Sequence, residues 1–227
     1  MPRSSARNTV PSVMTPLVVF RRLLAALLLV TLLSPAAFAE QRLILVVGDS
    51  LSAAYNMSTE NGWVHLLDDR LSNTTPDWRA HNASTSGETT RGGLSRLPRA
   101  LEEHEPALVI IALGGNDGLR GLPPAEIERN LQAMVEAAQA AGAEVLLAGV
   151  RIPPNYGATY LERFEQAFAN VADNTDSRLL PGILTGIDER PELFMNDRIH
   201  PTEEAQPLIL ENVWGKLEPM LENRKTF

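Results

Sequence analysis

Short apolar runs alternate with segments of helical periodicity along most of this chain, and this alternation constrains the fold more than any other feature. Three runs are almost entirely apolar and a fourth is weaker; in that order they lie at residues 43–47, 107–113, 144–150 and 77–81. A continuous apolar run of this length is typical of a strand buried on both faces of a parallel sheet. Helical patterns lie at residues 63–71, 93–103, 124–141, 158–172 and 203–221. The sequence therefore predicts one three-layer α/β/α domain with a parallel sheet.

Polar or glycine-rich segments follow each predicted strand. Ser50 follows the first strand, and residues 82–90, 114–121 and 151–157 follow the others. Right-handed crossovers bring the carboxyl ends of parallel strands to one edge of the sheet, where ligands bind in such folds. We therefore expect a functional site where these four segments meet.

The amino-terminal segment is typical of a secretory signal peptide. Two arginines at 21–22 precede an apolar run at residues 23–33, and the small-residue sequence Ala-Phe-Ala follows at 37–39. The run is shorter than the about 20 residues that a membrane span requires. We expect residues 1–39 to be removed, with an uncleaved amino-terminal anchor as the alternative.

Cleavage after Ala39 would leave one domain, residues 40–227, exported to the periplasm or, alternatively, secreted. Met14 competes with Met1 as the first residue, because the signal peptide is complete without residues 1–13.

Charge and cysteine content exclude several classes of function. The net charge is −8, and because the first 39 residues hold four arginines and no acidic residue, the remainder carries 16 basic and 28 acidic residues. An acidic surface repels phosphate backbones, so we expect no nucleic-acid partner. The chain has no cysteine, which excludes disulfides and a thiol nucleophile.

Ser50 is the first candidate for a reacting group. It lies in the sequence Gly-Asp-Ser-Leu-Ser, two residues beyond the first predicted strand, with Gly48 allowing a sharp turn and a helix-like stretch expected to follow. Its hydroxyl would point into the crevice, and its N–H would lie at a helix start. A serine that only caps a helix explains the same local pattern equally well. The neighbouring Asp49 is expected to hold loops together rather than to act on a base.

A serine nucleophile needs a general base, and His200 is the candidate. His200 follows Asp197 by three residues, a spacing that places both on one face of a turn, so that Asp197 can hold one imidazole nitrogen and leave the other for Ser50. The other histidines, at 65, 81 and 104, are interpreted as surface or packing residues. An ordinary turn with a capping Asp197 remains the alternative.

Three donors are candidates for an oxyanion hole. They are the backbone N–H of Ser50, the backbone N–H of Gly87 and the side-chain amide of Asn116. Glycine- and asparagine-rich loops are also simply turns. The sequence contains no phosphate-binding loop, no G-x-G-x-x-G and no metal-ligand spacing, so we expect no cofactor and no metal.

Four sequence blocks together resemble those of the SGNH (GDSL) hydrolase family. The blocks are G-D-S-L-S around Ser50, S-G-E-T around Gly87, G-G-N-D around Asn116 and D-x-x-H-P at Asp197 and His200. Residues 114–121, 154–157 and 205–207 further resemble the family's periplasmic group of acyl-CoA thioesterases, lysophospholipases and arylesterases. The resemblance covers residues 42–221. It implies a flavodoxin-like fold with a five-stranded parallel sheet and a metal-free Ser-His-Asp mechanism.

The expected function is therefore hydrolysis of small acyl esters and thioesters through a serine acyl-enzyme. The catalytic residues would be Ser50, Asp197 and His200, with Ser50, Gly87 and Asn116 forming the oxyanion hole. Candidates for lining an acyl groove are Leu119, Ile152, Pro153 and Tyr156. We expect a monomer without stable membrane insertion after cleavage. Two rival hypotheses are an esterase acting on acetylated carbohydrates and a non-catalytic lipid- or peptide-binding protein.

Overall fold

The computed structural model describes residues 41–222. The predicted signal peptide, its cleavage after Ala39 and the choice between Met1 and Met14 lie outside the described residues. Within 41–222, no helix is both long enough and apolar enough to cross a membrane.

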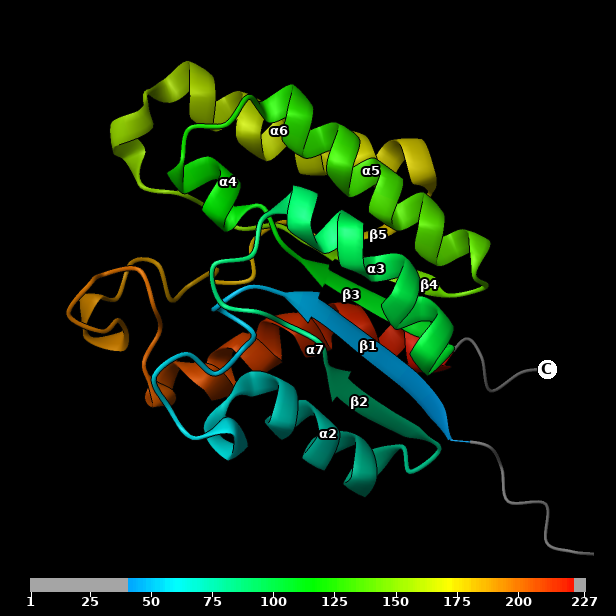
Figure 1. Ribbon diagram of the computed structural model, residues 1–227. Helices are drawn as coiled ribbons and strands as arrows, with labels where there is room; N and C mark the ends of the chain where they lie inside the picture. The colour runs from blue at the N-terminus through cyan, green and yellow to red at the C-terminus, as the bar shows by residue number, and fades with distance from the viewer. Residues whose placement is uncertain (1–40, 223–227) are drawn as a thin grey trace, which may run out of the picture. The chain divides into compact units, whose positions relative to one another are not determined.

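Five parallel strands form the central sheet in the order β2-β1-β3-β4-β5 (Figure 1). Their bounds are β1 Arg42–Gly48, β2 Trp78–Asn82, β3 Leu108–Ala112, β4 Glu144–Ala148 and β5 Arg178–Leu180. The prediction of a three-layer α/β/α domain with a five-stranded parallel sheet is confirmed.

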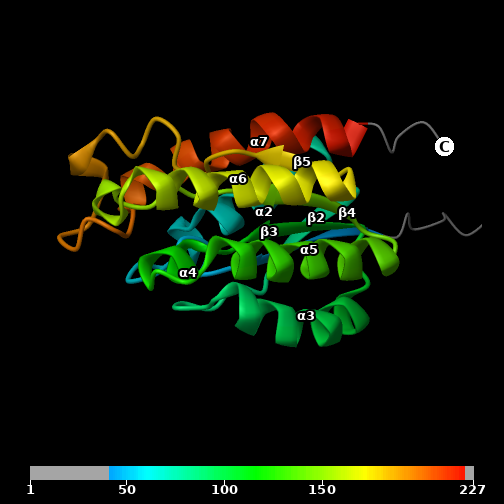
Figure 2. The ribbon, with the colours of Figure 1, turned by 90° about the horizontal axis from the view of Figure 1, so that it is seen from above.

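Helices cover both faces of this sheet (Figures 1 and 2). The described part of the chain contains five long helices: α2 Trp63–Thr74, α3 Thr90–His104, α5 Pro124–Ala140, α6 Ala158–Thr175 and α7 Gln206–Glu222. The chain steps from β1 to β2 in one direction and from β2 through β3 and β4 to β5 in the other. Because the crossovers are right-handed, this reversal places α2 on one face and α3, α5 and α6 on the opposite face. Helix α7 packs against α2 and completes the first face.

Shorter helices complete the fold at the ends of the strands. They are α4 Gly115–Leu119 and the single-turn 3₁₀ helices η1 Thr59–Asn61, η2 Pro154–Tyr156, η3 Pro191–Leu193 and η4 Glu203–Ala205. Helix α4 lies in the glycine- and asparagine-rich segment for which the sequence offered a donor loop or a simple turn, and the predicted final helix is divided between η4 and α7.

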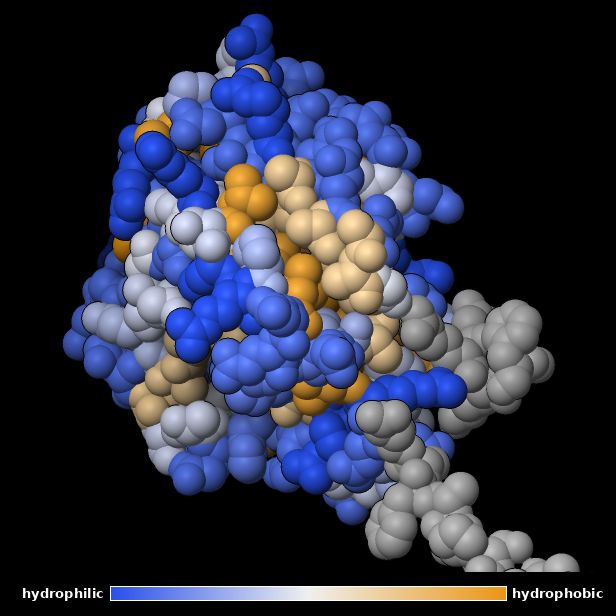
Figure 3. All heavy atoms as spheres, turned by 45° about the vertical axis from the view of Figure 1, so that its right-hand side comes forward, coloured by the Kyte–Doolittle hydropathy of each residue, from blue (hydrophilic) through white to orange (hydrophobic). Residues whose placement is uncertain are grey.

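The core lies between the sheet and its two helical layers. Every residue of β3 is buried, and β1 is buried from Ile44 to its end, because both strands have helices on both faces. At the edge of the sheet, β2 alternates between buried or half-buried and exposed positions, which explains its weaker apolar pattern. Among the described residues, Ile199 and Leu208 are the exposed large hydrophobic side chains, at 41% and 37%. The face in Figure 3 is mostly hydrophilic around a central hydrophobic cluster.

Candidate active site

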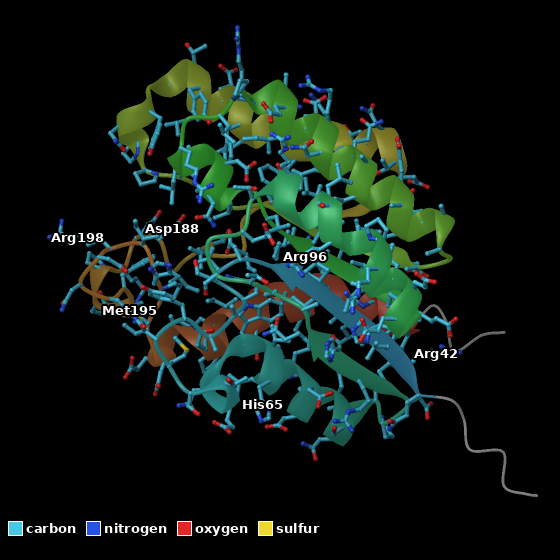
Figure 4. All side chains as sticks on the ribbon, viewed as in Figure 1. Arg42, His65, Arg96, Asp188, Met195 and Arg198 are labelled. Atoms are coloured by element: carbon cyan, nitrogen blue, oxygen red, sulfur yellow. The ribbon has the colours of Figure 1, made fainter. Side chains whose placement is uncertain are left out.

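The candidate residues gather at the carboxyl ends of the parallel strands. Figure 4 shows Asp188, Met195 and Arg198 on the loop beyond β5 at this end of the sheet, whereas Arg42 lies at the opposite end, where β1 begins. Strand β5 thus adds a fifth segment to the four that the sequence predicted to meet here.

Ser50 lies in a tight turn that Asp49 organises. The Asp49 carboxylate accepts a hydrogen bond from Leu51 N–H at 3.0 Å. The Asp49 carbonyl oxygen accepts hydrogen bonds from the N–H groups of Ser52 and Ala53, at 3.1 and 2.9 Å. The expected helix after Ser50 is wrong: residues 50–56 form turns, because these bonds end after a single helical turn.

Asp49 is buried at the base of this turn, with 3% of its surface exposed. Burial raises the pKa of Asp49 to about 6, although the hydrogen bonds from Leu51 N–H and from the Asn116 side chain oppose this rise. Its role in holding loops together agrees with the interpretation of the sequence.

Ser50, His200 and Asp197 form one continuous chain of hydrogen-bonding contacts. The Ser50 Oγ lies 2.9 Å from His200 Nε2, and His200 Nδ1 lies 2.7 Å from Asp197 Oδ2. Asp197 Oδ1 also accepts the backbone N–H groups of Ile199 and His200, at 2.9 and 3.0 Å. Hydrogen bonds to the Asp197 carboxylate, first from the His200 backbone N–H and then from the His200 ring, lower the pKa of Asp197 to about 2. The structure therefore brings together the three residues that the sequence proposed as partners.

A closed loop makes the three-residue spacing of Asp197 and His200 effective. Met195 N–H donates to the His200 carbonyl oxygen at 2.8 Å, and Phe194 pairs with Pro201 in an antiparallel bridge. Arg198 has a φ of +58°, a left-handed conformation that reverses the chain between the two residues. The geometry is thus a tight loop rather than a helical turn.

The three candidate oxyanion donors differ in their environments. Among the described residues, the N–H groups of Ser50 and Gly87 donate to no protein acceptor. The Asn116 Nδ2 donates to Asp49 Oδ2 at 3.2 Å and to the Glu88 carbonyl oxygen at 3.0 Å. Ser50 and Asn116 line the same cavity, whereas Gly87 is exposed and is not among the lining residues.

Two arginines that the sequence did not single out hold the loop that carries Gly87. Arg96, on α3, donates to Glu88 Oε2 at 2.8 Å and to the Ala83 carbonyl oxygen at 2.5 Å. Arg120 donates to the Gly87 carbonyl oxygen at 3.3 Å. These bonds fix the backbone on both sides of the Gly87 N–H.

Beside Ser50 and His200 opens a cavity of about 490 Å³, within the range of roughly 300–1,000 Å³ that is usual for ligand pockets. Leu119, Ile152 and Pro153, which the sequence proposed as lining residues of an acyl groove, are among its lining residues. Tyr156 is not among the lining residues; instead its hydroxyl donates to the Leu119 carbonyl oxygen at 2.7 Å.

Much of the remaining wall of this cavity comes from residues that the sequence did not indicate, although Arg151 belongs to a segment that was expected at the site. Apolar side chains are contributed by Val150, Leu184, Phe194 and Ile199, and charged ones by Arg151, Asp188, Glu189 and Arg198. Most belong to the irregular segment between β5 and α7, which has no periodic pattern.

The other histidines lie away from this cavity. His65 lies on α2, apart from the loop of Asp188 and Arg198 in Figure 4, and contacts Asp69 at 3.7 Å. The rings of His81 and His104 pack on each other with their centroids 4.3 Å apart. A second cavity, of about 440 Å³ and lined by residues including Gln139, Asp176 and Arg178, contains no serine–histidine pair.

Comparisons with known proteins agree with the resemblance seen in the sequence. The model of the GDSL-like lipase/acylhydrolase family matches residues 46–207. Esterase TesA of Pseudomonas aeruginosa is 48% identical over 199 residues, which are 88% of this chain and 98% of that protein. An arylesterase of Vibrio mimicus is 44% identical, with 86% of this chain and 96% of that protein covered.

Thioesterase 1/protease 1/lysophospholipase L1 of Escherichia coli is 42% identical, with 89% of this chain and 95% of that protein covered. A crystal structure of TesA matches with a TM-score of 0.77 at 49% identity and covers 78% of this chain and 99% of the other. The psychrotrophic esterase EstA of Pseudoalteromonas gives the same TM-score at 41% identity, with 80% of this chain and 99% of the other covered.

Proposed function

Since the chain belongs to the GDSL-like lipase/acylhydrolase family and is an ester hydrolase, we propose that it cleaves acyl esters and thioesters through a Ser50–His200–Asp197 triad and an acyl-enzyme. The observation that carries this proposal is the contact chain Asp197–His200–Ser50, whose Ser50 and His200 line the cavity.

The distances support a role for His200 as the base. The imidazole carries its proton on Nδ1, donates it toward Asp197 Oδ2, and leaves Nε2 to accept the Ser50 hydroxyl proton at 2.9 Å. As Ser50 Oγ attacks the acyl carbon, its proton passes to Nε2, and the imidazolium that forms then protonates the leaving alkoxide or thiolate. Water, activated in turn by His200, hydrolyses the acyl-serine.

Oxyanion stabilisation is proposed for Ser50 N–H, Gly87 N–H and Asn116. The two backbone groups are available as donors among the described residues. The Asn116 amide already has two acceptors, so it must share the hydrogen that now points to Asp49, the longer of its two contacts at 3.2 Å. Each donor is worth roughly 10²–10³ in turnover when it acts in this way.

The apolar wall of the cavity favours acyl chains longer than acetyl. Leu119, Ile152 and Phe194 offer hydrocarbon contacts beside the reacting group. Burying one methylene is worth about 0.8 kcal/mol, so two added carbons should raise kcat/KM on the order of tenfold. This argues against the rival hypothesis of a carbohydrate acetylesterase.

The test is an acyl-length series on the protein of residues 40–227. We expect p-nitrophenyl octanoate and octanoyl thioesters to exceed the acetyl ester and an acetylated xylooligosaccharide in kcat/KM. A preference for the acetylated sugar would support the rival enzyme instead.

A serine substitution separates catalysis from binding. Ser50→Ala should lower esterase turnover by about 10³-fold or more with folding unchanged. Ser95→Ala, an exposed serine on α3, is the matched control and should leave turnover as it was. Full activity in Ser50→Ala would exclude the triad, and no activity in the parent protein would favour the non-catalytic binder.

We also propose that residues 1–39 are a cleaved signal peptide and that the domain works as a periplasmic monomer. The mass of the protein recovered from the periplasm of an expressing cell tests the first point, with Glu40 as the expected first residue. Retention in the membrane fraction at full length would contradict it. Size-exclusion chromatography with light scattering tests the second, with the mass of one chain expected.

A further inference from the structure

An aromatic ring lies flat against the candidate base. The rings of Tyr55 and His200 are stacked, with their centroids 4.1 Å apart and their planes inclined by 28°. Both edge nitrogens of the imidazole are engaged by Ser50 and Asp197. Tyr55 therefore contacts the imidazole through a face, which is the part of the ring that its hydrogen bonds leave unrestrained.

The backbone on both sides of Tyr55 has an unusual conformation. Ala54 and Asn56 each have a φ of +54°, in the left-handed region that residues other than glycine rarely adopt. Such conformations persist only where the surrounding structure enforces them, and they concentrate at functional sites. The two left-handed residues directly flank the residue whose ring stacks on His200.

Neighbouring elements hold this turn in place. The Trp63 indole N–H, on α2, donates to the Leu51 carbonyl oxygen at 3.1 Å, and the Asn82 amide, at the end of β2, donates to the Ser52 carbonyl oxygen at 2.7 Å. Ala54 packs closely against Gly62: a Cβ added at Gly62 would lie only 2.9 Å from the Ala54 Cβ. The segment that carries Tyr55 is thus anchored to the same sheet and helix that position Ser50.

The face of an aromatic ring is electronegative and attracts a cation that lies over it. In the proposed reaction His200 is neutral before attack and becomes an imidazolium as it takes the Ser50 proton. A ring stacked on its face interacts more strongly with the charged form, and so with the transition state, than with the resting state.

We propose that Tyr55 is a positioning residue for His200: its ring face keeps the imidazole in line with Ser50 and stabilises the imidazolium. The inference rests on the proposed function. Tyr55 is not among the residues that line the cavity, so it acts through His200 and not on the substrate.

Other charged groups face the imidazole and stay the same in the variants below. Asp197 lies at Nδ1, and Asp49 interacts electrostatically with His200. The charged residues that line the same cavity are Arg151, Asp188, Glu189 and Arg198.

Two substitutions separate the aromatic face from the other properties of Tyr55. Tyr55→Phe keeps the ring and removes the hydroxyl, whereas Tyr55→Leu keeps an apolar cover and removes the π face. The pH titration of the His200 ring proton by NMR compares the two with the parent protein, and the His65, His81 and His104 resonances serve as internal controls. We expect an unchanged midpoint in Tyr55→Phe and a midpoint lower by about 0.4–1.5 pH units in Tyr55→Leu.

Kinetics give the second readout. Tyr55→Leu should lower kcat by about 2- to 30-fold with KM unchanged and move the acid limb of the pH–rate profile to lower pH, and Tyr55→Phe should restore both. Equal midpoints in Tyr55→Leu and the parent protein, or equal loss of kcat in Tyr55→Phe and Tyr55→Leu, would overturn the proposal.

The two readouts keep this inference distinct from the proposed function. An NMR shift in a protein that hydrolyses no ester would refute the function and leave the hold of Tyr55 on His200 standing. Unchanged titration in a protein whose turnover depends on Ser50 would refute the role of Tyr55 alone.

Discussion

Replacing Asp197 with asparagine should strongly lower kcat, because it reverses the tautomer of His200, while the loop stays intact. Asp197 Oδ1 accepts two backbone N–H groups, from Ile199 and His200, at 2.9 and 3.0 Å. An amide nitrogen cannot accept these bonds, so the asparagine carbonyl must take this position. Its NH₂ group then faces His200 Nδ1, which in turn must become an acceptor.

The consequence falls on the other imidazole nitrogen. With Nδ1 unprotonated, a neutral ring carries its proton on Nε2 and points it at Ser50 Oγ, now 2.9 Å away. Nε2 can no longer accept the hydroxyl proton, and the loss of kcat should be on the order of 10³–10⁴. Because both backbone bonds survive and the carboxylate is partly exposed, the free energy of unfolding should change by less than about 1 kcal/mol.

The assay is kcat on p-nitrophenyl octanoate, with urea unfolding to measure stability. Asp69→Asn is the matched control, because Asp69 and His65 form another aspartate–histidine contact, at 3.7 Å and away from the cavity. It should leave kcat unchanged. An Asp197→Asn variant that keeps a tenth or more of the parent kcat would refute the tautomer argument.

Two further predictions concern stability. Burial raises the pKa of Asp49 from 3.8 to about 6. Ionising this buried carboxyl therefore destabilises the folded state: the destabilisation is absent below pH 4, where Asp49 is protonated in both states, and grows to about 3 kcal/mol above pH 6. The free energy of unfolding of Asp49→Asn, relative to the parent protein, should therefore rise by this order between pH 4 and pH 7, and a constant difference in urea titrations would count against it. Gly149→Ala places a Cβ 2.5 Å from the Pro181 carbonyl oxygen and should lower the free energy of unfolding by about 1–3 kcal/mol. Gly215 lies in α7, where an added Cβ meets nothing within 4 Å, so Gly215→Ala should raise the free energy of unfolding by about 0.5–1 kcal/mol. Equal unfolding free energies for the two glycine variants would show that the close approach does not matter.

The strands with helices on both faces were the most predictable part of the fold. Strands β1, β3 and β4 read as continuous apolar runs because most of their residues are buried. Strand β5 has only three residues and begins with the exposed Arg178, so its pattern carries no signal, and the family resemblance alone supplied a fifth strand.

The meeting of Ser50, Asp197 and His200 was predictable because strand ends share an edge and a three-residue spacing pairs the last two. The cavity wall formed by Leu184 and Phe194 could not be predicted, because these residues lie in an irregular segment whose path depends on tertiary contacts. The stacking of Tyr55 on His200 was not predictable either. Its flanking residues Ala54 and Asn56 are both left-handed, and although asparagine tolerates this conformation, no sequence rule marks an alanine for it.

Covalent labelling tests the central claim, that Ser50 is the nucleophile, most directly. A fluorophosphonate reacts with a serine only where a base activates its hydroxyl. After incubation of the protein with a fluorophosphonate and digestion, mass spectrometry of the peptides should place one adduct on Ser50, in proportion to the esterase activity lost. Loss of activity with the adduct on another residue, or full activity with Ser50 modified, would contradict the account.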